Sequence, residues 1–178
     1  MSSMLVRVAL LLTSIALMVA WFSAGPSGRP TGPDTGEQIP DVRLVSIRAE
    51  KGQSLHQYVR ESPGCVLVSF VSTHCSACSR MRATWPSRTR AWMDSVGSPV
   101  RFAWVASEPP SALESFVSSF DFSDFDLFAF DPVESNPLST LGVFGTPTTY
   151  LIDGDGRLRY GVLGPLLPPS EFAASVCS

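Results

Sequence analysis

The sequence predicts an α/β fold in which helices flank a mixed central sheet on both faces. Apolar runs of strand length alternate with segments of helical character, which is typical of parallel strands joined by helices. Near the carboxyl end, the run Asp153-Gly154-Asp155-Gly156 between two β-rich segments predicts a hairpin, and therefore antiparallel strands as well. A chain of 178 residues has room for one such domain and a tail, but not for two well-sized cores.

In the amino-terminal half of the domain, residues 42–47 largely alternate apolar and polar side chains, as a half-buried strand does. Residues 54–61 predict a short helix that begins at a serine cap. Residues 65–72 are densely apolar and predict a buried central strand, and residues 76–94 carry a partial apolar stripe typical of a helix. We expect a kink or a break at Pro86, because proline lacks the amide hydrogen and clashes with the preceding turn.

The carboxyl-terminal half shows the same signals. Pairs of prolines precede two predicted helices, since proline is favoured where a helix begins. Apolar or β-rich runs predict the strands, and the hairpin run joins the last two of them. The expected strands are at 100–106, 126–130, 148–152 and 158–163, and the expected helices are at 111–120 and 170–176, with a single helical turn at 136–141.

The composition excludes several classes of protein. Apolar residues make up 44% of the chain and charged residues 16%, which fits a globular domain with a membrane segment better than a disordered protein. The net charge of -3 gives no basic surface, so no nucleic acid is expected as a partner. Four cysteines are too few for a domain stapled by disulfides, but one C-x-x-C pair suits a redox protein outside the reducing cytosol.

The first 40 residues predict a membrane anchor and a tether. Residues 4–22 are apolar except for three positions, and this length can cross a bilayer if Arg7 reaches the headgroups. A cleaved signal peptide is the alternative. Arg7 and the amino terminus weakly favour the cytoplasmic side for that end. The expected parts are a transmembrane helix at 1–22, a Gly/Pro-rich tether at 23–40 and the folded domain at 41–178.

The junction between the central strand and the long helix holds Cys75 and Cys78. A thiolate at the first turn of a helix faces unpaired backbone N–H groups and the positive end of the helix dipole, so its pKa falls. Cys75 is therefore predicted to attack disulfides at neutral pH. Cys78 lies one helical turn further on, close enough to form a disulfide with Cys75 and release a trapped partner. These two cysteines are the predicted catalytic residues.

Together with this pair, residues 142–158 (GVFGTPTTYLIDGDGRL) carry a resemblance to a known family. The chain from residue 40 to residue 176 resembles the thioredoxin fold and, more narrowly, membrane-anchored bacterial thiol-disulfide oxidoreductases of the TlpA/ResA/CcmG type. The resemblance implies a thioredoxin-like fold and a cis peptide bond between Thr146 and Pro147, packed beside the cysteines. Cis geometry there would let the Thr146 backbone bind an extended substrate.

Several positions depart from the family pattern. His74 stands where a tryptophan commonly precedes the first cysteine, and Ala83 replaces a proline of the first helix. Met81 and Ser69 occupy the two positions where members carry an acid. A carboxylate that could manage the proton of Cys78 is therefore missing from both usual places.

Alternatives to a redox role for the C-x-x-C pair are a structural disulfide and a zinc site. Zinc would need four ligands, and His74 and His56 do not supply a second paired cluster beside Cys75 and Cys78, so no metal is expected. His74, if protonated, would favour the Cys75 thiolate and tune its potential. A solvent-exposed His74 without effect is the equal alternative.

The other two cysteines leave a second question open. In a thioredoxin-like fold the last helix runs back toward the edge where the strand of Cys65 begins, so a structural disulfide between Cys65 and Cys177 is possible. Two free thiols, with Cys65 buried as a small apolar residue, are the more conservative alternative.

The predicted function is an extracytoplasmic thiol:disulfide oxidoreductase on the bacterial inner membrane, with a redox-active Cys75–Cys78 disulfide and no cofactor. The expected partners are proteins with disulfides, a membrane thiol electron donor and the membrane itself through the amino-terminal helix. One alternative is a maturation factor for a single client, of the cytochrome c or methylamine-utilisation type. A peroxide reductase of the same fold is less favoured, because Val68 occupies the position of a proline typical of such enzymes.

Overall fold

The structure is a computed structural model that describes residues 33–49 and 51–177. The predicted anchor at residues 1–22 and most of the predicted tether lie outside the described residues. Within the described ranges, none of the helices combines the length and the apolar character needed to cross a membrane.

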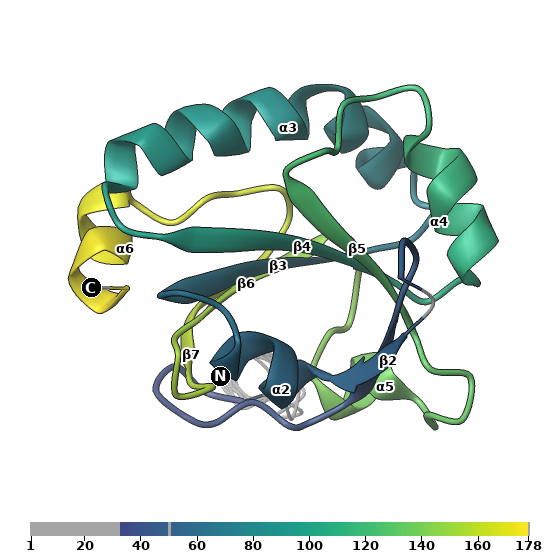
Figure 1. The fold of residues 1–178 in the computed structure, drawn as a ribbon, viewed down its shortest axis with the longest axis horizontal. Helices are drawn as coiled ribbons and strands as arrows, with labels where there is room; N and C mark the ends of the chain where they lie inside the picture. Colours follow the sequence, from purple (N-terminus) through teal and green to yellow (C-terminus); the bar gives the residue numbers. More distant parts are fainter. Residues whose placement is uncertain (1–32, 50, 178) are drawn as a thin grey trace, which may run out of the picture. The chain divides into compact units, whose positions relative to one another are not determined.

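Seven strands form one sheet in the order β2-β1-β5-β4-β3-β6-β7 (Figure 1). β3, β4 and β5 are parallel to one another, whereas β1, β2, β6 and β7 pair antiparallel with their neighbours. The sheet is therefore mixed, as the alternation of strands and helices and the hairpin signal predict. The strands are β1 (Arg43–Ser46), β2 (Gly52–Ser54), β3 (Cys65–Val71), β4 (Val100–Ala106), β5 (Phe125–Phe130), β6 (Thr148–Ile152) and β7 (Leu158–Leu163).

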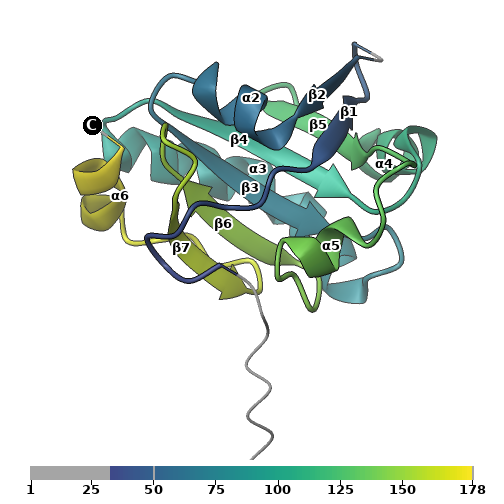
Figure 2. The same ribbon diagram turned by 90° about the horizontal axis from the view of Figure 1, so that it is seen from below.

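Helices cover both faces of the sheet. Figure 1 shows α3 and α6 on one side of the strands and α2 and α5 on the other, and Figure 2, turned by 90°, shows α2 and α5 on the near face. Two clusters of buried side chains correspond to these two faces, and α4 contributes to the cluster that contains α3. The helices are α2 (Leu55–Arg60), α3 (Ser76–Val96), α4 (Pro110–Val117), α5 (Pro137–Thr140) and α6 (Ser170–Val176).

The central position of β3 follows from its sequence. All seven of its side chains are buried, because neighbouring strands flank it on both sides and helices cover both faces. Alternate residues enter opposite cores: Leu67 and Val71 pack under α3, while Val68 and Phe70 face α2 and α5. The carboxyl end of β3 thus brings the chain out of the interior, and Cys75 follows in the next turn.

Of the kink or break expected at Pro86, the break does not occur, since α3 is continuous from Ser76 to Val96. Figure 1 shows one ribbon that bends toward its amino-terminal end. Pro86 is buried, as are Trp85 and Trp92 on the same helix, so packing against the sheet compensates for one missing backbone hydrogen bond. Thr89 Oγ1 also donates to the carbonyl oxygen of Trp85 at 2.9 Å, which ties the turn around the proline together.

Two segments near the amino end of the domain were not predicted from local pattern. β2 pairs antiparallel with β1 at the edge of the sheet, although its sequence, GQS, has no strand signature. Residues 36–39, which composition assigns to the tether, lie against the hairpin: Gly36 N–H donates to the Leu158 carbonyl at 2.7 Å, and Ile39 N–H donates to the Gly156 carbonyl at 2.9 Å. Both segments depend on pairing with distant backbone, which local composition does not report.

Cys65 and Cys177 form a disulfide, so the question that the sequence left open is answered by the bonded alternative. The bond joins the start of β3 to the end of α6, with the two Cα atoms 5.1 Å apart and a sequence separation of 112. Gly64 is required beside this bond. Its φ is +71°, and a Cβ atom there would lie 2.2 Å from the Pro99 carbonyl oxygen and 3.1 Å from that of Cys177.

Candidate active site

The turn after β3 delivers Cys75 to the amino end of α3. Cys75 is the N-cap residue of this helix, with extended backbone angles of φ −82° and ψ 118°. Its Sγ accepts a hydrogen bond from the Cys78 N–H at 3.2 Å, and its own N–H donates to the Ser72 carbonyl at 3.1 Å. The sulfur therefore occupies the place that a serine or aspartate oxygen usually takes at a helix cap.

This placement gives the two sulfurs opposite acid–base properties. Partial burial raises the pKa of Cys75, but hydrogen bonds from the Cys78 thiol and from the N–H groups of Cys78 and Ala77 outweigh it, and the net pKa is lowered. Burial, followed by the hydrogen bond to Cys75, raises the pKa of Cys78 to about 12. Cys75 is partly exposed, whereas Cys78 is fully buried. The geometry therefore suits Cys75 as the attacking thiolate and Cys78 as a buried thiol that stays protonated until the resolving step.

The loop before β6 forms the opposite wall of the site. The peptide bond between Thr146 and Pro147 is cis, and the Thr146 carbonyl oxygen lies 3.1 Å from the Cys75 Sγ. Gly164 N–H donates to the Pro147 carbonyl at 2.7 Å, which holds this loop against the end of β7. The cis bond and the approach of Thr146 to the Cys75 sulfur agree with what the resemblance implies.

Apolar side chains are exposed beside this wall. Phe144 is 61% exposed and Leu163 is 69% exposed, on either side of Gly145. A Cβ atom on Gly145 would lie 3.1 Å from the Leu163 side chain, so the two segments are in direct contact. Large apolar side chains that stay in water next to a reactive group are typical of a surface that binds another molecule.

The structure also places the other residues that the sequence analysis compared with the family pattern. His74 is exposed, and only its backbone N–H makes a hydrogen bond, to the Ser72 Oγ at 3.2 Å. Ser69 is buried and its hydroxyl lies 3.5 Å from that of Thr149, while Met81 packs in the core under α3. Neither position carries a charge that could act on Cys78.

Sequence reasoning missed one polar group at this site. Glu108, just after β4, accepts a hydrogen bond from the Ser72 hydroxyl through its Oε1 at 2.5 Å. β3 and β4 are parallel, with Val71 aligned with Ala106, so the residues that follow them emerge side by side. That register is the signal that could have pointed to Glu108, but it requires knowing which strands are neighbours.

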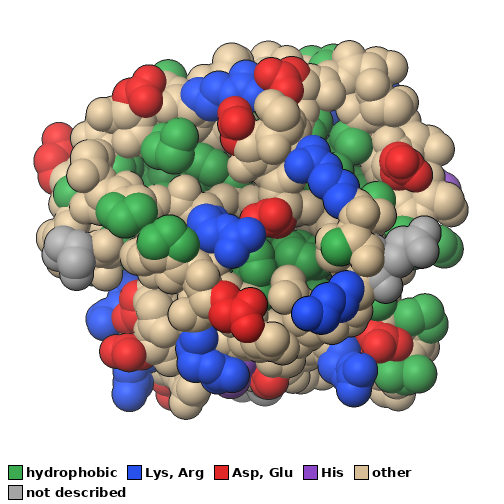
Figure 3. All heavy atoms as spheres, viewed as in Figure 1, with side chains coloured by type: hydrophobic (Ala, Val, Ile, Leu, Met, Phe, Trp, Pro, Cys, Tyr) green, Lys and Arg blue, Asp and Glu red, His purple; other side chains and the backbone are tan. Residues whose placement is uncertain are grey.

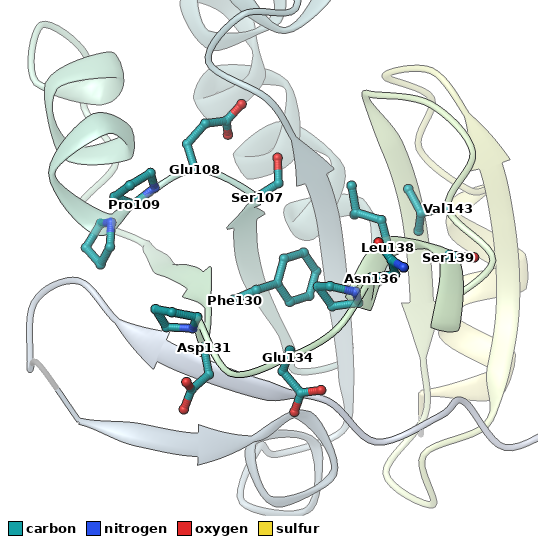
Figure 4. Close-up of a pocket in the computed structure, with 13 residues that line it drawn as sticks. Ser107, Glu108, Pro109, Phe130, Asp131, Glu134, Asn136, Leu138, Ser139 and Val143 are labelled. Atoms are coloured by element: carbon teal, nitrogen blue, oxygen red, sulfur yellow. The ribbon is translucent and has the colours of Figure 1, made fainter.

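A cleft of about 610 Å³ opens next to Glu108, between the loops that follow β4 and β5 and the helix α5 (Figure 4). Phe130, Leu138 and Val143 line its apolar part. In Figure 4 the Glu108 side chain points away from Phe130 and away from Asp131. Glu108 is itself one of the residues that line this cleft.

Charges of both signs are mixed on the face of the molecule drawn in Figure 3. The face drawn in Figure 3 shows Lys and Arg side chains interspersed with Asp and Glu, separated by small apolar patches. Arg90, for example, pairs with both Asp121 and Asp124. Within residues 33–49 and 51–177, no three His, Cys, Asp or Glu side chains come close enough together to hold a metal ion.

Comparison with known proteins identifies a relative and a common fold. No protein-family model matches the sequence. The chain is 30% identical over 132 residues to the thiol:disulfide interchange protein DsbE homolog of Paracoccus denitrificans, covering 74% of this chain and 68% of that protein.

Solved structures agree on the architecture. The thioredoxin domain of a thiol-disulfide oxidoreductase from Bacteroides vulgatus superposes with a TM-score of 0.60 at 18% identity, covering 74% of this chain and 89% of that one. Peroxidoxin BcpB from Mycobacterium tuberculosis superposes with a TM-score of 0.57 at 14% identity, covering 80% and 92%. The thioredoxin-like α/β fold is confirmed, and at these identities the two structures are evidence of fold alone.

Proposed function

Because the chain belongs to the thiol:disulfide interchange family represented by the DsbE homolog and is a thiol-disulfide oxidoreductase, we propose that it exchanges disulfides with exported client proteins through Cys75 and Cys78. The observation that carries this proposal is the position of Cys75 as the N-cap of α3, with the Cys78 N–H directed at its sulfur. Only a thiolate gains fully from that arrangement.

The reaction follows from the two sulfurs. The Cys75 thiolate attacks one sulfur of the client disulfide, a bond forms between Cys75 and the client, and the second client sulfur leaves with the electron pair and takes a proton. Cys78 then loses its proton and attacks the Cys75 sulfur, which breaks the mixed disulfide and releases the first client sulfur as a thiolate. The client is reduced by two electrons, and the Cys75–Cys78 pair is oxidised to a disulfide.

Exposed apolar surface favours a polypeptide as the substrate. Phe144 and Leu163 flank the loop whose Thr146 carbonyl approaches the nucleophile. An extended client segment could contact this loop while its cysteine reaches Cys75. Small thiols such as glutathione would leave most of this apolar surface in water.

The proposed location is the extracytoplasmic side of the bacterial inner membrane. A structural disulfide between Cys65 and Cys177 supports an oxidising compartment, since such bonds are rare where glutathione keeps thiols reduced. The apolar run at residues 4–22 supports a single membrane anchor. A membrane thiol donor would return two electrons to the Cys75–Cys78 disulfide after each turnover.

A trapping experiment tests the proposal. In the full chain, Cys78→Ser retains the nucleophile but removes the resolving thiol, so clients should accumulate as mixed disulfides on Cys75. The matched control is the Cys75→Ser, Cys78→Ser double variant, which should capture nothing. Captured proteins are released with a reductant and identified by mass spectrometry. Absence of any Cys75-dependent adduct with exported proteins would contradict the proposal.

The same experiment separates the client-specific alternative. Many captured proteins indicate a general oxidoreductase, whereas one dominant client indicates a maturation factor of the cytochrome c or methylamine-utilisation type. Peroxide reduction is tested separately by direct consumption of hydrogen peroxide by the reduced protein. Turnover with peroxide that exceeds turnover with a protein disulfide would overturn the assignment to disulfide exchange.

A further inference from the structure

The cleft of about 610 Å³ between the loops after β4 and β5 has an apolar lining. Figure 4 draws Phe130 between the loop of Glu108 and the segment that carries Leu138 and Val143. Four prolines extend the apolar lining: Pro109, Pro110, Pro132 and Pro137. Ligand sites in proteins commonly have this volume, and apolar surface gains free energy when a ligand removes it from water.

The charged side chains that line this cleft are all acidic. Asp131 and Glu134 stand on its rim, and Glu108 forms part of its wall. Glu108 Oε2 has no hydrogen-bond partner among the described residues. Asp131 pairs with Arg43 at 3.4 Å, but Arg43 is 64% exposed and does not line the cleft. No lysine, arginine or histidine is found among the described residues that do, so the cleft favours a ligand with positive charge.

Asn136 adds a neutral polar group to the same lining. Its backbone is left-handed, with φ 53° and ψ 50°, and it is the only residue other than glycine with positive φ in the described ranges. Its side-chain amide does not cap α5, the helix that begins at the next residue. A side-chain amide can donate one hydrogen bond and accept another, as a peptide group does. Asn136 is therefore suited to bind the backbone of an extended polypeptide.

The cleft is connected to the nucleophile along two routes. Val143 lines the cleft, and Thr146, three residues later, places its carbonyl 3.1 Å from the Cys75 sulfur. The backbone from Val143 to Thr146 spans at most about 11 Å. Glu108 accepts the hydroxyl of Ser72, which lies in the turn before Cys75. A polypeptide bonded to Cys75 thus needs only about three to five residues to reach the cleft.

We propose that this cleft is a specificity subsite for the client polypeptide, and that it binds an apolar side chain next to a lysine or arginine, about three to five residues from the client cysteine. This inference rests on the proposed disulfide exchange and names the sequence that the exchange prefers. The apolar side chain lies against Phe130, Leu138 and Val143. The basic side chain lies at the rim, where Glu134 is held by the Arg43 N–H at 2.9 Å.

Peptide kinetics test this inference. The full chain carrying Cys78→Ser is mixed with disulfide-linked peptide dimers on a Gly/Ser background, and Cys75 attack leaves one peptide bonded to the protein and releases the other as a thiol. The dimers carry Leu-Lys, Leu-Glu or Ser-Lys about four positions before the cysteine in one set and after it in the other. Acid quenching and mass spectrometry give the rate of mixed-disulfide formation against peptide concentration.

In one of the two sets, the Leu-Lys peptide should react fastest. At low peptide concentration we expect a rate about tenfold above that of Ser-Lys, because leucine leaves water. The rate should be about twofold to fivefold above that of Leu-Glu, because the rim charges are partly solvated. The gain should appear in the half-saturating concentration and not in the limiting rate of attack, since the subsite binds the client but does not touch the reacting sulfurs.

Two variants of the cleft locate the effect. Glu134→Gln retains an acceptor for the Arg43 N–H and should abolish the preference for Leu-Lys over Leu-Glu. Asn136→Gly accepts the same left-handed backbone and removes only the amide, so the half-saturating concentration of Leu-Lys should rise about threefold. Asp155→Asn, which neutralises an exposed carboxylate in the β6–β7 hairpin, is the matched control and should retain the preference of the parent protein.

A cross-link shows directly what the cleft holds. The leucine of the Leu-Lys peptide is replaced by photoreactive benzoylphenylalanine, the mixed disulfide with Cys75 is formed and irradiated, and the linked residues are mapped by mass spectrometry. Cross-links should fall within residues 107–110 and 130–143. Cross-links confined to Phe144 or Leu163 would overturn the inference. So would a yield that falls as the protein is concentrated, because a second copy of the chain would then occupy the cleft.

The remaining outcomes separate this inference from the proposed function. Equal rates for the three peptides in both sets, or a preference that Glu134→Gln leaves intact, would show that the cleft does not select clients, although disulfide exchange would stand. A preference lost equally in Asp155→Asn would show a general charge effect and would also overturn the subsite. Absence of any mixed disulfide on Cys75 with all peptides would contradict the proposed disulfide exchange itself.

Discussion

At the start of β3, Cys65 is bonded to Cys177, whereas the turn that follows the end of β3 presents Cys75 and Cys78 as thiols. Cys177 is the C-cap residue of α6, and Cys75 is the N-cap residue of α3. The carboxyl end of a helix carries partial negative charge and disfavours a thiolate, while the amino end favours one. Cysteine is thus found in two states, bonded in one pair and free in the other. The partial charge of the helix terminus beside Cys177 is opposite to that beside Cys75.

The disulfide pair and the free thiol pair also differ in their exposure to solvent. Cys65 and Cys177 are 0% and 5% exposed, so reductants have little access to their bond. Cys75 is partly exposed next to the loop of Thr146. One end of β3 thus carries a buried disulfide and the other leads to a partly exposed thiol, a contrast that the following experiments can break or sharpen.

The largest expected effect comes from Cys75→Ser. Serine can still cap α3, because its hydroxyl accepts the same N–H group, so the fold and the unfolding midpoint should be retained. Exchange with a protein disulfide should fall to the uncatalysed background, since the hydroxyl does not ionise near neutral pH. An insulin-reduction assay measures this loss, and residual exchange at the wild-type rate would show that Cys75 is not the nucleophile.

Removal of the other pair should show the opposite pattern. The Cys65→Ala, Cys177→Ala double variant loses a cross-link across 112 residues. The chain-entropy relation predicts a loss of roughly 4–5 kcal/mol in the free energy of unfolding. Urea denaturation of the oxidised proteins measures it. The rate of attack by Cys75, measured well below the denaturation midpoint, should remain near wild type, and its loss would mean that the two ends of β3 are coupled.

The smallest expected effect is on the pH dependence of the free energy of unfolding of the reduced protein. The pKa of Cys75 is lowered in the folded state, so the stability that its thiolate contributes is complete above the unfolded pKa and is lost as pH falls through the folded pKa. The pKa of Cys78 is raised to about 12, so its contribution is complete below the unfolded pKa and is lost as pH rises toward that value.

Ultraviolet absorbance of the thiolate checks this sign. One thiol should ionise below the ordinary range of cysteine and the other should stay protonated well above it. Cys75→Ser should remove the low transition, and Cys78→Ser should remove the high one. Two thiols that ionise together in the ordinary range would contradict the contrast drawn between them.

Local sequence pattern predicted the bounds of a strand or helix where turn residues or prolines flank an apolar run. The strands at 100–106, 148–152 and 158–163 and the helix at 170–176 have the predicted bounds, because apolar runs, turn residues and proline pairs mark them in the sequence itself. Ser54 caps α2 as predicted, with its Oγ accepting the Gln57 N–H at 3.0 Å. At Pro86 the helix continues without a break, because packing rather than intrinsic propensity holds it.

The order of strand, C-x-x-C and helix already placed Cys75 at a helix terminus, because capping and dipole effects act over one turn of the chain. The bond between Cys65 and Cys177, the strand at Gly52–Ser54 and the approach of Glu108 to Ser72 depended instead on which strands and helices became neighbours. Contacts between residues tens of positions apart are created by the packing of the whole sheet. Such contacts leave no periodic or compositional trace in a single sequence.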